Sequence, residues 1–383
     1  MKKLAIKNFK CFEDTEVEFK NLTILAGANG AGKSTVIQVL LLLKQSYDIH
    51  SVSLDNMKYL YLNDYYCELG TVGEVLYAGF EDDTMSFSFY NDDNATRELL
   101  CKGQTKGNKL NIIKSIPNEI ERSMKTTTSF LYNFDFISAD RFGPKNYHHA
   151  DGNFSEMKVG KFGEYTSIIL NKEINNGTFV EALNNTLSFI FGNIEIEPKS
   201  IDEANIFMYK IRNTKDTNLG FKTPVNMPYG VSYVLPIIVS CLSRLHKKEV
   251  LDETDTIIIE EPESHLHHEV ELNSNIGTIL IENPEAHLHP SAQSRLGIFL
   301  SEMANAGLKI ILETHSDHII NGIRIAIKKK TIDNNNVLFN FFEQGEKLGQ
   351  NTIREINIDK NGNLSEWPKG FFDQYENDLM DLM

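Results

Sequence analysis

The strongest structural signal in this 383-residue chain is the segment Leu22-Thr23-Ile24-Leu25-Ala26-Gly27-Ala28-Asn29-Gly30-Ala31-Gly32-Lys33-Ser34-Thr35. Residues 22–26 are mostly apolar and predict a buried strand. Residues 27–35 fit the pattern G-x-x-x-x-G-K-[ST] without a mismatch. The apolar run Val36–Lys44 that follows predicts a helix. A strand, a glycine-rich turn and a helix in this order predict an α/β fold built around a phosphate-binding loop (P-loop).

The P-loop predicts a ligand as well as a fold. Its glycines allow the backbone to form a concave nest of N–H groups that hold phosphate oxygens. Lys33 can reach the β- and γ-phosphates, the Ser34 hydroxyl can ligate Mg²⁺, and the positive end of the following helix faces the anion. We therefore expect ATP and Mg²⁺ as cofactors. The expected nucleotide-binding residues are Gly27, Ala28, Asn29, Gly30, Ala31, Gly32, Lys33, Ser34 and Thr35.

The charge of the chain argues against nucleic acid as its main ligand. The net charge is −15, whereas binding to nucleic acid draws most of its affinity from Lys and Arg that neutralise phosphates. The basic run Lys328-Lys329-Lys330 could contact a phosphate backbone, although a solvated helix end is the simpler interpretation. Because of this basic run, nucleic acid is kept as a candidate partner.

The cysteines and the apolar runs indicate a cytoplasmic protein without a membrane span. Cys11, Cys67, Cys101 and Cys241 lie far apart in sequence, so no metal-binding or redox pair is visible. The apolar run from Val36 to Leu43 is far shorter than the ~20 residues that cross a bilayer. No signal-peptide core follows the N-terminus.

The segment Ile6-Lys7-Asn8-Phe9-Lys10-Cys11-Phe12, followed by the P-loop, resembles the RecF, SMC and overcoming-lysogenization-defect (OLD) ATPases. This resemblance implies an ABC-type nucleotide-binding domain with a β-rich lobe and a helical inserted lobe. It also implies a homodimer that closes around ATP. The chain looks like the bacterial members of this group that serve as ATPase subunits in anti-phage defence systems.

Two further segments resemble motifs of that group. Tyr229-Gly230-Val231-Ser232-Tyr233-Val234-Leu235-Pro236 looks like the signature segment, in which Ser232 would contact the γ-phosphate held by the other subunit, in trans. A Gly and a Ser before an apolar helix are also an ordinary helix N-cap, so the pattern is weak by itself. Lys309-Ile310-Ile311-Leu312-Glu313-Thr314-His315-Ser316-Asp317 predicts a buried strand that ends at the family's switch histidine, His315.

An internal repeat supplies two versions of the family's acidic Walker B strand. Thr256-Ile257-Ile258-Ile259-Glu260-Glu261-Pro262-Glu263-Ser264-His265-Leu266-His267 recurs 22 positions later as Thr278-Ile279-Leu280-Ile281-Glu282-Asn283-Pro284-Glu285-Ala286-His287-Leu288-His289, with nine of twelve residues identical. In the family pattern the first acidic residue helps to hold Mg²⁺, and the second is the general base or orients water. Both copies therefore carry candidate catalytic residues: Glu260 and Glu261 in the first, and Glu282, Asn283 and Glu285 in the second.

Spacing does not decide which copy lies beside the P-loop. Ser232 precedes Glu260 by 28 positions, and Glu282 precedes His315 by 33 positions, and both distances suit the family. The amphipathic stretch Ala292–Asn305 after the second copy predicts the required helix, so we favour Glu282 as the Mg²⁺-holding residue. Asn283 opposes this choice, because Asn cannot accept a proton and the loss of a general base costs roughly 10²–10⁴ in rate.

We expect one ABC-type domain that spans the chain and has five segments. These are residues 1–50 (P-loop segment), 51–144 (β-rich lobe), 145–247 (helices and loops with the signature segment), 248–327 (Walker B and switch histidine) and 328–383 (C-terminal segment). Arg141 and Glu164 lie in family-like segments and are interpreted as fold support. The leading functional hypothesis is a dimeric ATPase that couples ATP state to a separate effector or nucleic acid. The alternative is an ATP-binding scaffold or sensor with negligible hydrolysis.

Overall fold

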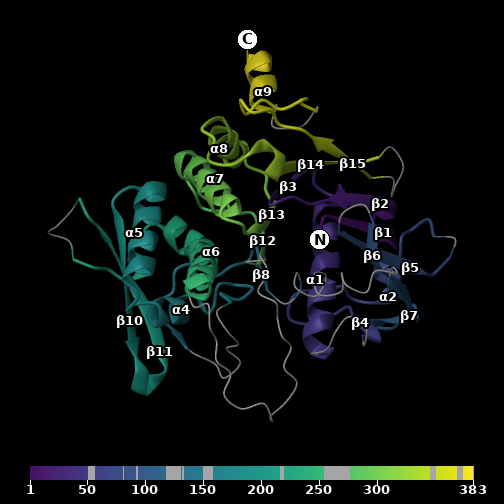
Figure 1. Cartoon of the computed structure of the whole chain (residues 1–383), viewed down its shortest axis with the longest axis horizontal. Helices are drawn as coiled ribbons and strands as arrows, with labels where there is room; N and C mark the ends of the chain where they lie inside the picture. Colours follow the sequence, from purple (N-terminus) through teal and green to yellow (C-terminus); the bar gives the residue numbers. More distant parts are fainter. Residues whose placement is uncertain are drawn as a thin grey trace.

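The computed structural model describes residues 1–50, 57–80, 82–91, 94–117, 131, 133–149, 158–215, 220–253, 277–345, 351–368 and 374–382. Figure 1 shows a central sheet with helices on one side of it, and a second sheet on the side where helix α1 lies. The first copy of the acidic repeat, including Glu260 and Glu261, lies outside the described residues.

The central sheet carries the P-loop, and its strand order is β15-β14-β3-β13-β12-β8. Strands β14, β3, β13, β12 and β8 run parallel, and β15 pairs antiparallel at the edge. The strands are β3 (Leu22–Gly27), β8 (Phe134–Ile137), β12 (Thr278–Glu282), β13 (Lys309–Glu313), β14 (Val337–Glu343) and β15 (Thr352–Ile356). The second copy of the acidic repeat therefore forms a strand of this sheet, separated from the P-loop strand by β13.

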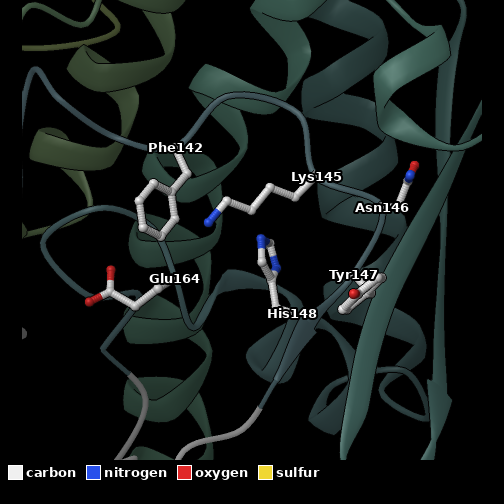
Figure 2. Close-up of a pocket in the computed structure, with 6 residues that line it drawn as sticks. All are labelled: Phe142, Lys145, Asn146, Tyr147, His148 and Glu164. Carbon is white, nitrogen blue, oxygen red and sulfur yellow. The ribbon is translucent and has the colours of Figure 1, made fainter.

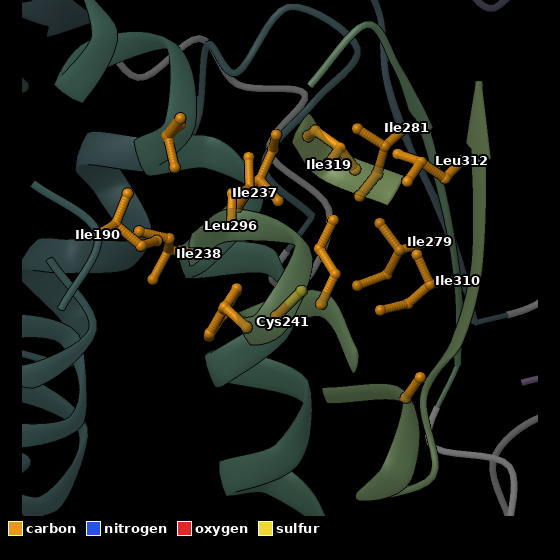
Figure 3. Packing of buried hydrophobic residues seen from close by; sticks show 14 of the residues in the cluster. Ile190, Ile237, Ile238, Cys241, Ile279, Ile281, Leu296, Ile310, Leu312 and Ile319 are labelled. Carbon is orange, nitrogen blue, oxygen red and sulfur yellow. The ribbon is translucent and has the colours of Figure 1, made fainter. Parts of the chain in front are cut away.

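Alternation along the central strands creates two hydrophobic layers, as expected for a parallel sheet covered on both faces. Odd-numbered residues of β12 and even-numbered residues of β13 face helices α5 (Gly177–Phe191), α6 (Tyr229–Glu253), α7 (Pro290–Asn305) and α8 (Asp317–Lys328). Figure 3 shows Ile279, Ile281 and Leu312 of this layer near Ile237 and Leu296 of the helices.

The opposite layer packs against α1 (Lys33–His50) and the second sheet. Leu280 of β12 and Ile311 of β13 share this layer with Val36 of α1. Because successive side chains of a strand point to opposite faces, Glu282 and Glu313, two residues farther along, also point to the α1 face. The P-loop and the strand-end carboxylates thus meet on one face.

The second sheet is antiparallel, with the order β2-β1-β5-β6-β7-β4. It combines two strands from the N-terminal segment with four strands from the segment expected to be β-rich. Its members are β1 (Lys3–Phe9), β2 (Phe12–Glu18), β4 (Tyr59–Tyr61), β5 (Met85–Asn91), β6 (Asn94–Lys102) and β7 (Lys109–Pro117). The short helix α2 (Val72–Val75) lies beside it.

The segment predicted to hold helices and loops also contains a β-hairpin, which sequence analysis missed. Strands β10 (Ile194–Ile201) and β11 (Ile206–Asn213) pair antiparallel, and β9 (His148–His149) joins them. The apolar side chains of Ile194 and Ile196 alternate with glutamates and fit the period of two of a strand. The expected helices are present as α4 (Thr166–Lys172) and α5.

The remaining elements are short. They are the 3₁₀ turns η3 (Asp202–Ala204), η4 (Pro224–Asn226) and η5 (Asn334–Asn336), and the C-terminal helix α9 (Gln374–Leu382). Among the described residues, no helix combines the length and the apolar character that crossing a bilayer requires.

Two glycines set the distance between α7 and α8, the helices that follow β12 and β13. A Cβ atom added at Gly322 would lie 2.0 Å from the Ser294 carbonyl oxygen, and one added at Gly297 would lie 2.3 Å from the Ile319 carbonyl oxygen. Both partners are backbone atoms, so a larger side chain must push the helices apart.

We predict that Gly322→Ala lowers the free energy of unfolding by about 1–3 kcal/mol through overpacking, although alanine favours a helix by about 1 kcal/mol. Urea denaturation followed by circular dichroism measures the change. Gly177→Ala is the control, because a Cβ atom there meets nothing within 4 Å, and it should be neutral or stabilising. Equal stability of the two variants would contradict the close approach of the helices.

Candidate nucleotide site

The P-loop connects β3 directly to α1, which begins at Lys33, three residues before the predicted start. Gly27 and Gly32 have φ angles of 130° and 107°, a region that only glycine enters without strain. Gly27 also lies against β14, because a Cβ atom there would be 2.2 Å from the Phe342 carbonyl oxygen. The P-loop glycines are therefore required by backbone shape and by packing.

The Lys33 ammonium folds back over the P-loop. Lys33 Nζ donates to the carbonyl oxygens of Gly27 and Ala28, both at 2.9 Å. The residue is 4% exposed, and burial lowers the pKa of its ammonium, while nearby Glu313 opposes that shift. A phosphate could replace these two neutral carbonyl acceptors with a charged one, which forms the stronger hydrogen bond.

A carboxylate that sequence analysis left without a role lies next to the P-loop serine. Ser34 Oγ lies 3.2 Å from Glu313 Oε1 and 3.4 Å from Glu313 Oε2 and donates toward this carboxylate. Glu313 ends β13 and is 7% exposed. The sequence does contain a feature that could have identified Glu313: it is a carboxylate at the end of an apolar strand, directly before the Thr-His pair of the switch segment.

The site gathers negative charge where water is largely excluded. Burial, together with the negative charge of Glu282, raises the pKa of Glu313 to about 7, while Lys33 and Ser34 oppose the shift. Burial also raises the pKa of Glu282, against the hydrogen bonds that its carboxylate accepts. A cation placed here would stabilise both carboxylates in their ionised form.

The Glu282 carboxylate is directed away from the P-loop. Its Oε2 accepts a hydrogen bond from Ala139 N at 3.2 Å and lies 3.4 Å from Ser138 Oγ, both in the loop after β8. Strand β8 is the neighbour of β12 on the side opposite to β13. Glu282 thus lies on the far side of the site from Ser34.

Asn283 occupies a backbone position that suits its residue type. Its φ angle is 42°, and Asn enters this left-handed region more readily than longer side chains. Its backbone N–H donates to the Glu313 carbonyl oxygen at 3.0 Å. Backbone geometry therefore accounts for an asparagine here without reference to catalysis.

Glu285 connects the loop after β12 with the loop after β13. It accepts hydrogen bonds from Thr314 Oγ1 and from His315 N, both at 2.8 Å. The His315 side chain is exposed, and its pKa is lowered by partial burial and by the positive charge of Lys33. His315 is therefore mainly neutral at pH 7 and can accept or donate a hydrogen bond at the edge of the site.

Arg141 joins the loop after β8, the end of β12 and helix α6. Its guanidinium donates to four carbonyl oxygens, those of Tyr233, Ser138, Glu282 and Asn283, at 2.8–2.9 Å. The side chain is 2% exposed, and burial lowers its pKa to about 10, so it stays charged at neutral pH. The expectation of fold support for Arg141 agrees with these contacts.

The Ser232 hydroxyl, which was expected to contact a nucleotide held by the other subunit, is buried in this structure. Ser232 lies inside α6, is 4% exposed, and its hydroxyl is 3.2 Å from Tyr209 Oη. Because α6 begins at Tyr229, Ser232 does not cap the helix, and its hydroxyl faces Tyr209 rather than solvent in this structure. Tyr229, which is 58% exposed, forms the accessible helix start, whereas Gly230 is buried.

The histidines of the second repeat copy have structural partners. His289 Nδ1 accepts from Ser291 N and caps α7. The His287 ring lies 4.3 Å from the Tyr233 ring, centroid to centroid. Within the described residues, no group of three His, Cys, Asp or Glu side chains could hold a metal ion.

A separate cavity of about 470 Å³ is lined by none of the predicted site residues. Figure 2 shows Lys145 between Phe142 and His148, with Glu164 at the other side of the cavity. Glu164 accepts hydrogen bonds from Tyr65 Oη and Phe162 N, which agrees with a structural role. Burial and the charge of Lys145 lower the pKa of His148 to about 4.

The residues at the P-loop fit a nucleotide with Mg²⁺. Positive φ angles at Gly27, Gly30 and Gly32 shape the turn, and the start of α1 points its free N–H groups toward it. Ser34 and Glu313 offer oxygen atoms, which are the ligands that Mg²⁺ prefers. Adjacent ligands of an octahedral Mg²⁺ lie about 3 Å apart, close to the 3.2 Å between Ser34 Oγ and Glu313 Oε1.

Comparison with family models gives two matches. The model of the AAA ATPase domain family matches residues 1–139 and 268–320, together half of the chain. The model of a protein family of unknown function, DUF3696, matches residues 332–382. The first match contains the P-loop, the second repeat copy and His315.

Individual relatives are distant. The OLD nuclease of Thermus scotoductus (strain ATCC 700910 / SA-01) is 42% identical over 40 residues, which are 10% of this chain and 8% of that protein. The chain therefore spans only a small part of this curated relative.

Solved structures of SMC head domains are similar at low identity. The head domain from Thermotoga maritima has a TM-score of 0.45 at 13% identity and covers 93% of this chain and 99% of its own. An SMC head bound to the C-terminal winged-helix domain of ScpA has a TM-score of 0.49 at 13% identity, with coverages of 93% and 98%.

We predict that Arg141→Lys lowers the free energy of unfolding by about 2–4 kcal/mol. A lysine ammonium cannot reach four carbonyl groups in this arrangement, and each buried acceptor left unpaired costs about 1–3 kcal/mol. Urea denaturation measures the loss. Arg295→Lys, at an exposed arginine that donates to the Phe189 carbonyl oxygen, is the control. A loss no larger than that of the control would contradict the joining role of Arg141.

Proposed function

The chain belongs to the AAA ATPase domain family, and on this premise we propose that it binds ATP with Mg²⁺ at the P-loop and hydrolyses it. The observation that carries the proposal is the convergence of Lys33, Ser34, Glu313 and His315 on the turn between β3 and α1. The nucleotide phosphates would lie in the turn, held by its N–H groups and Lys33, with Mg²⁺ beside Ser34.

We assign the catalytic Walker B position to the second repeat copy. Two observations support this choice: β12 is separated from the P-loop strand by one strand only, and the family match includes residues 268–320 but not 140–267. Asn283 cannot accept a proton, so hydrolysis would be slow. Glu285, which holds the backbone of His315, would keep the switch histidine in place for the γ-phosphate and the attacking water.

We predict that the purified chain hydrolyses ATP. Lys33→Ala should lower the turnover rate at least about tenfold, because the phosphates lose their charged partner. Phosphate release measures the rate, and Lys20→Ala, two residues before β3, is the lysine control. Equal turnover in wild type and Lys33→Ala would overturn the proposal of hydrolysis. Retained ATP affinity in that case would favour the alternative, a scaffold or sensor with negligible turnover.

The same assay distinguishes the two copies. Glu282→Gln should lower turnover while Glu261→Gln leaves it close to wild type. The reverse result would move the catalytic assignment to the first copy.

We further propose that the chain works as a homodimer that closes around ATP. The start of α6 supports this idea, because Tyr229 is exposed there and the N-terminal end of a helix favours a nearby anion, such as one held by another subunit. Closure would transmit the ATP state to a separate effector or nucleic acid in the cytoplasm, as part of prokaryotic defence or DNA maintenance. All four cysteines are free thiols, which suits a reducing compartment.

We predict that ATP promotes dimerisation of wild type and that Tyr229→Ala weakens it at least about tenfold, because a large exposed ring at the helix start is an efficient interface anchor. Analytical ultracentrifugation with and without Mg-ATP measures the effect. Phe80→Ala, at another exposed aromatic residue, is the control. A monomer at all ATP concentrations would exclude the homodimer.

A further inference from the structure

We propose that the cavity lined by Lys145 and His148 is a second ligand site, which binds the phosphate group of a nucleotide. The nucleotide is either a free molecule or the end of a single nucleic-acid strand, because both present the same phosphate and base. This site is separate from the P-loop, so the inference goes beyond the proposed hydrolysis of ATP and does not depend on it.

The cavity is built from the loop after β8, strand β9 and the loop before α4 (Figure 2). None of the described residues that line it belongs to the P-loop. Its volume is about 470 Å³, within the roughly 300–1,000 Å³ of small-molecule sites. The cavity is therefore large enough for a mononucleotide.

The Lys145 ammonium is available to an anion. Its Nζ lies 3.2 Å from the centroid of the Phe142 ring, and it forms no ion pair or hydrogen bond within the described part of the chain. Glu164, the carboxylate among the described lining residues, accepts hydrogen bonds from Tyr65 Oη and Phe162 N instead. A phosphate oxygen would bind the ammonium more strongly than the face of a phenyl ring does.

His148 supplies a second polar atom that lacks a partner. Its Nδ1 is hydrogen-bonded to the Ser167 hydroxyl of α4, which is fully buried and fixes the orientation of the ring. Its Nε2 is buried and has no hydrogen-bond partner among the described residues. When the Ser167 hydroxyl donates to Nδ1, Nε2 carries the ring hydrogen and becomes a donor. A buried donor without an acceptor favours a ligand that brings one.

The two groups are close enough for one phosphate to bind both. Burial and the positive charge of Lys145 lower the pKa of His148 to about 4, and Figure 2 shows the Lys145 ammonium next to the imidazole ring. The ring is therefore neutral at pH 7, and Lys145 carries the charge that offsets the phosphate. Because Nε2 is buried, we expect the exposed Lys145 side chain to leave the Phe142 ring when the phosphate enters.

Two residues between Lys145 and His148 suit the base of a nucleotide. The Tyr147 ring is 51% exposed, and bases of any sequence stack on exposed aromatic rings. Asn146 is exposed as well, and its amide has the donors and the acceptor that the edge of a base requires. A simple carboxylate or inorganic phosphate would use neither residue, hence a nucleotide is the ligand that the cavity fits best.

The test is isothermal titration calorimetry with the full chain carrying Lys33→Ala, in EDTA, so that the P-loop contributes little binding. With adenosine monophosphate as the probe, we expect one binding site per chain. Adding Lys145→Met, which removes the charge but keeps the aliphatic stem, should weaken binding at least about tenfold. Lys145→Arg should retain it. Lys199→Met, at an exposed lysine of β10, is the control with the same change in net charge and should bind like the parent.

A substitution at Tyr147 separates the base from the phosphate. Tyr147→Leu should weaken the binding of adenosine monophosphate at least about fivefold and leave the binding of inorganic phosphate unchanged. A short single-stranded oligonucleotide with a 5′-phosphate distinguishes the two sources. Tighter binding of this strand than of adenosine monophosphate would identify a strand end as the ligand, and equal or weaker binding would identify a free nucleotide.

Three results would contradict the inference. The first is no binding of adenosine monophosphate, inorganic phosphate or the oligonucleotide at millimolar concentrations. The second is equal affinity of Lys145→Met and its parent. The third is unchanged affinity for adenosine monophosphate in Tyr147→Leu, which would remove the nucleotide assignment. Because every protein in this test carries Lys33→Ala, these results leave the proposal for the P-loop unaffected, and a failure of ATP hydrolysis would leave the cavity unaffected.

Discussion

The close approach of one edge of a parallel sheet to the start of one helix governs this structure. Strands β3, β13 and β12 end at the same edge, and α1 begins there at Lys33. Parallel strands put their carboxyl ends together, so the polar residues that follow them gather at one place. The P-loop glycine Gly27 makes this approach possible, because β14 leaves no room for a Cβ atom. Strands, helices and loops farther away maintain this arrangement.

The gathering of polar groups has an electrostatic cost that explains the neighbouring contacts. Glu313 and Glu282 are brought onto one face in adjacent strands; burial and the charge of Glu282 raise the pKa of Glu313, and burial raises the pKa of Glu282. Two like charges in a poorly hydrated site disfavour each other. The protein holds Glu282 with donors of the loop after β8 and leaves Glu313 beside Ser34. Such a site is more stable with a cation than without one.

A second set of contacts makes the site respond as a unit. Arg141 binds carbonyl groups at the end of β12 and in α6, and Glu285 binds the backbone after β13. A shift of the loop after β12 would therefore change the contacts at α6 and at His315. Because α6 also exposes Tyr229 at its start, the same contacts could connect the nucleotide to a partner surface. Physical coupling of this kind requires packed, hydrogen-bonded neighbours rather than sequence proximity.

Local patterns in the sequence were enough to predict the P-loop, its flanking strand and helix, the strand before His315 and the helix after the second repeat copy. Each of these depends on neighbouring residues only: glycine spacing, short apolar runs and the spacing of apolar residues in a helix. The hairpin β10–β11 was missed, although its alternation is visible, because many of its side chains are exposed or half-buried and polar residues stand between the apolar ones.

Three features of the structure depend on contacts between residues that are far apart in the chain. The burial of Ser232 against Tyr209, the position of the second repeat copy within the central sheet, and the contact of Glu313 with Ser34 all follow from strand order and helix packing. The sequence alone therefore determined that a phosphate-binding loop exists and which residues form it. Only the tertiary structure decided which carboxylate faces that loop, because distance across a sheet depends on which strands are neighbours.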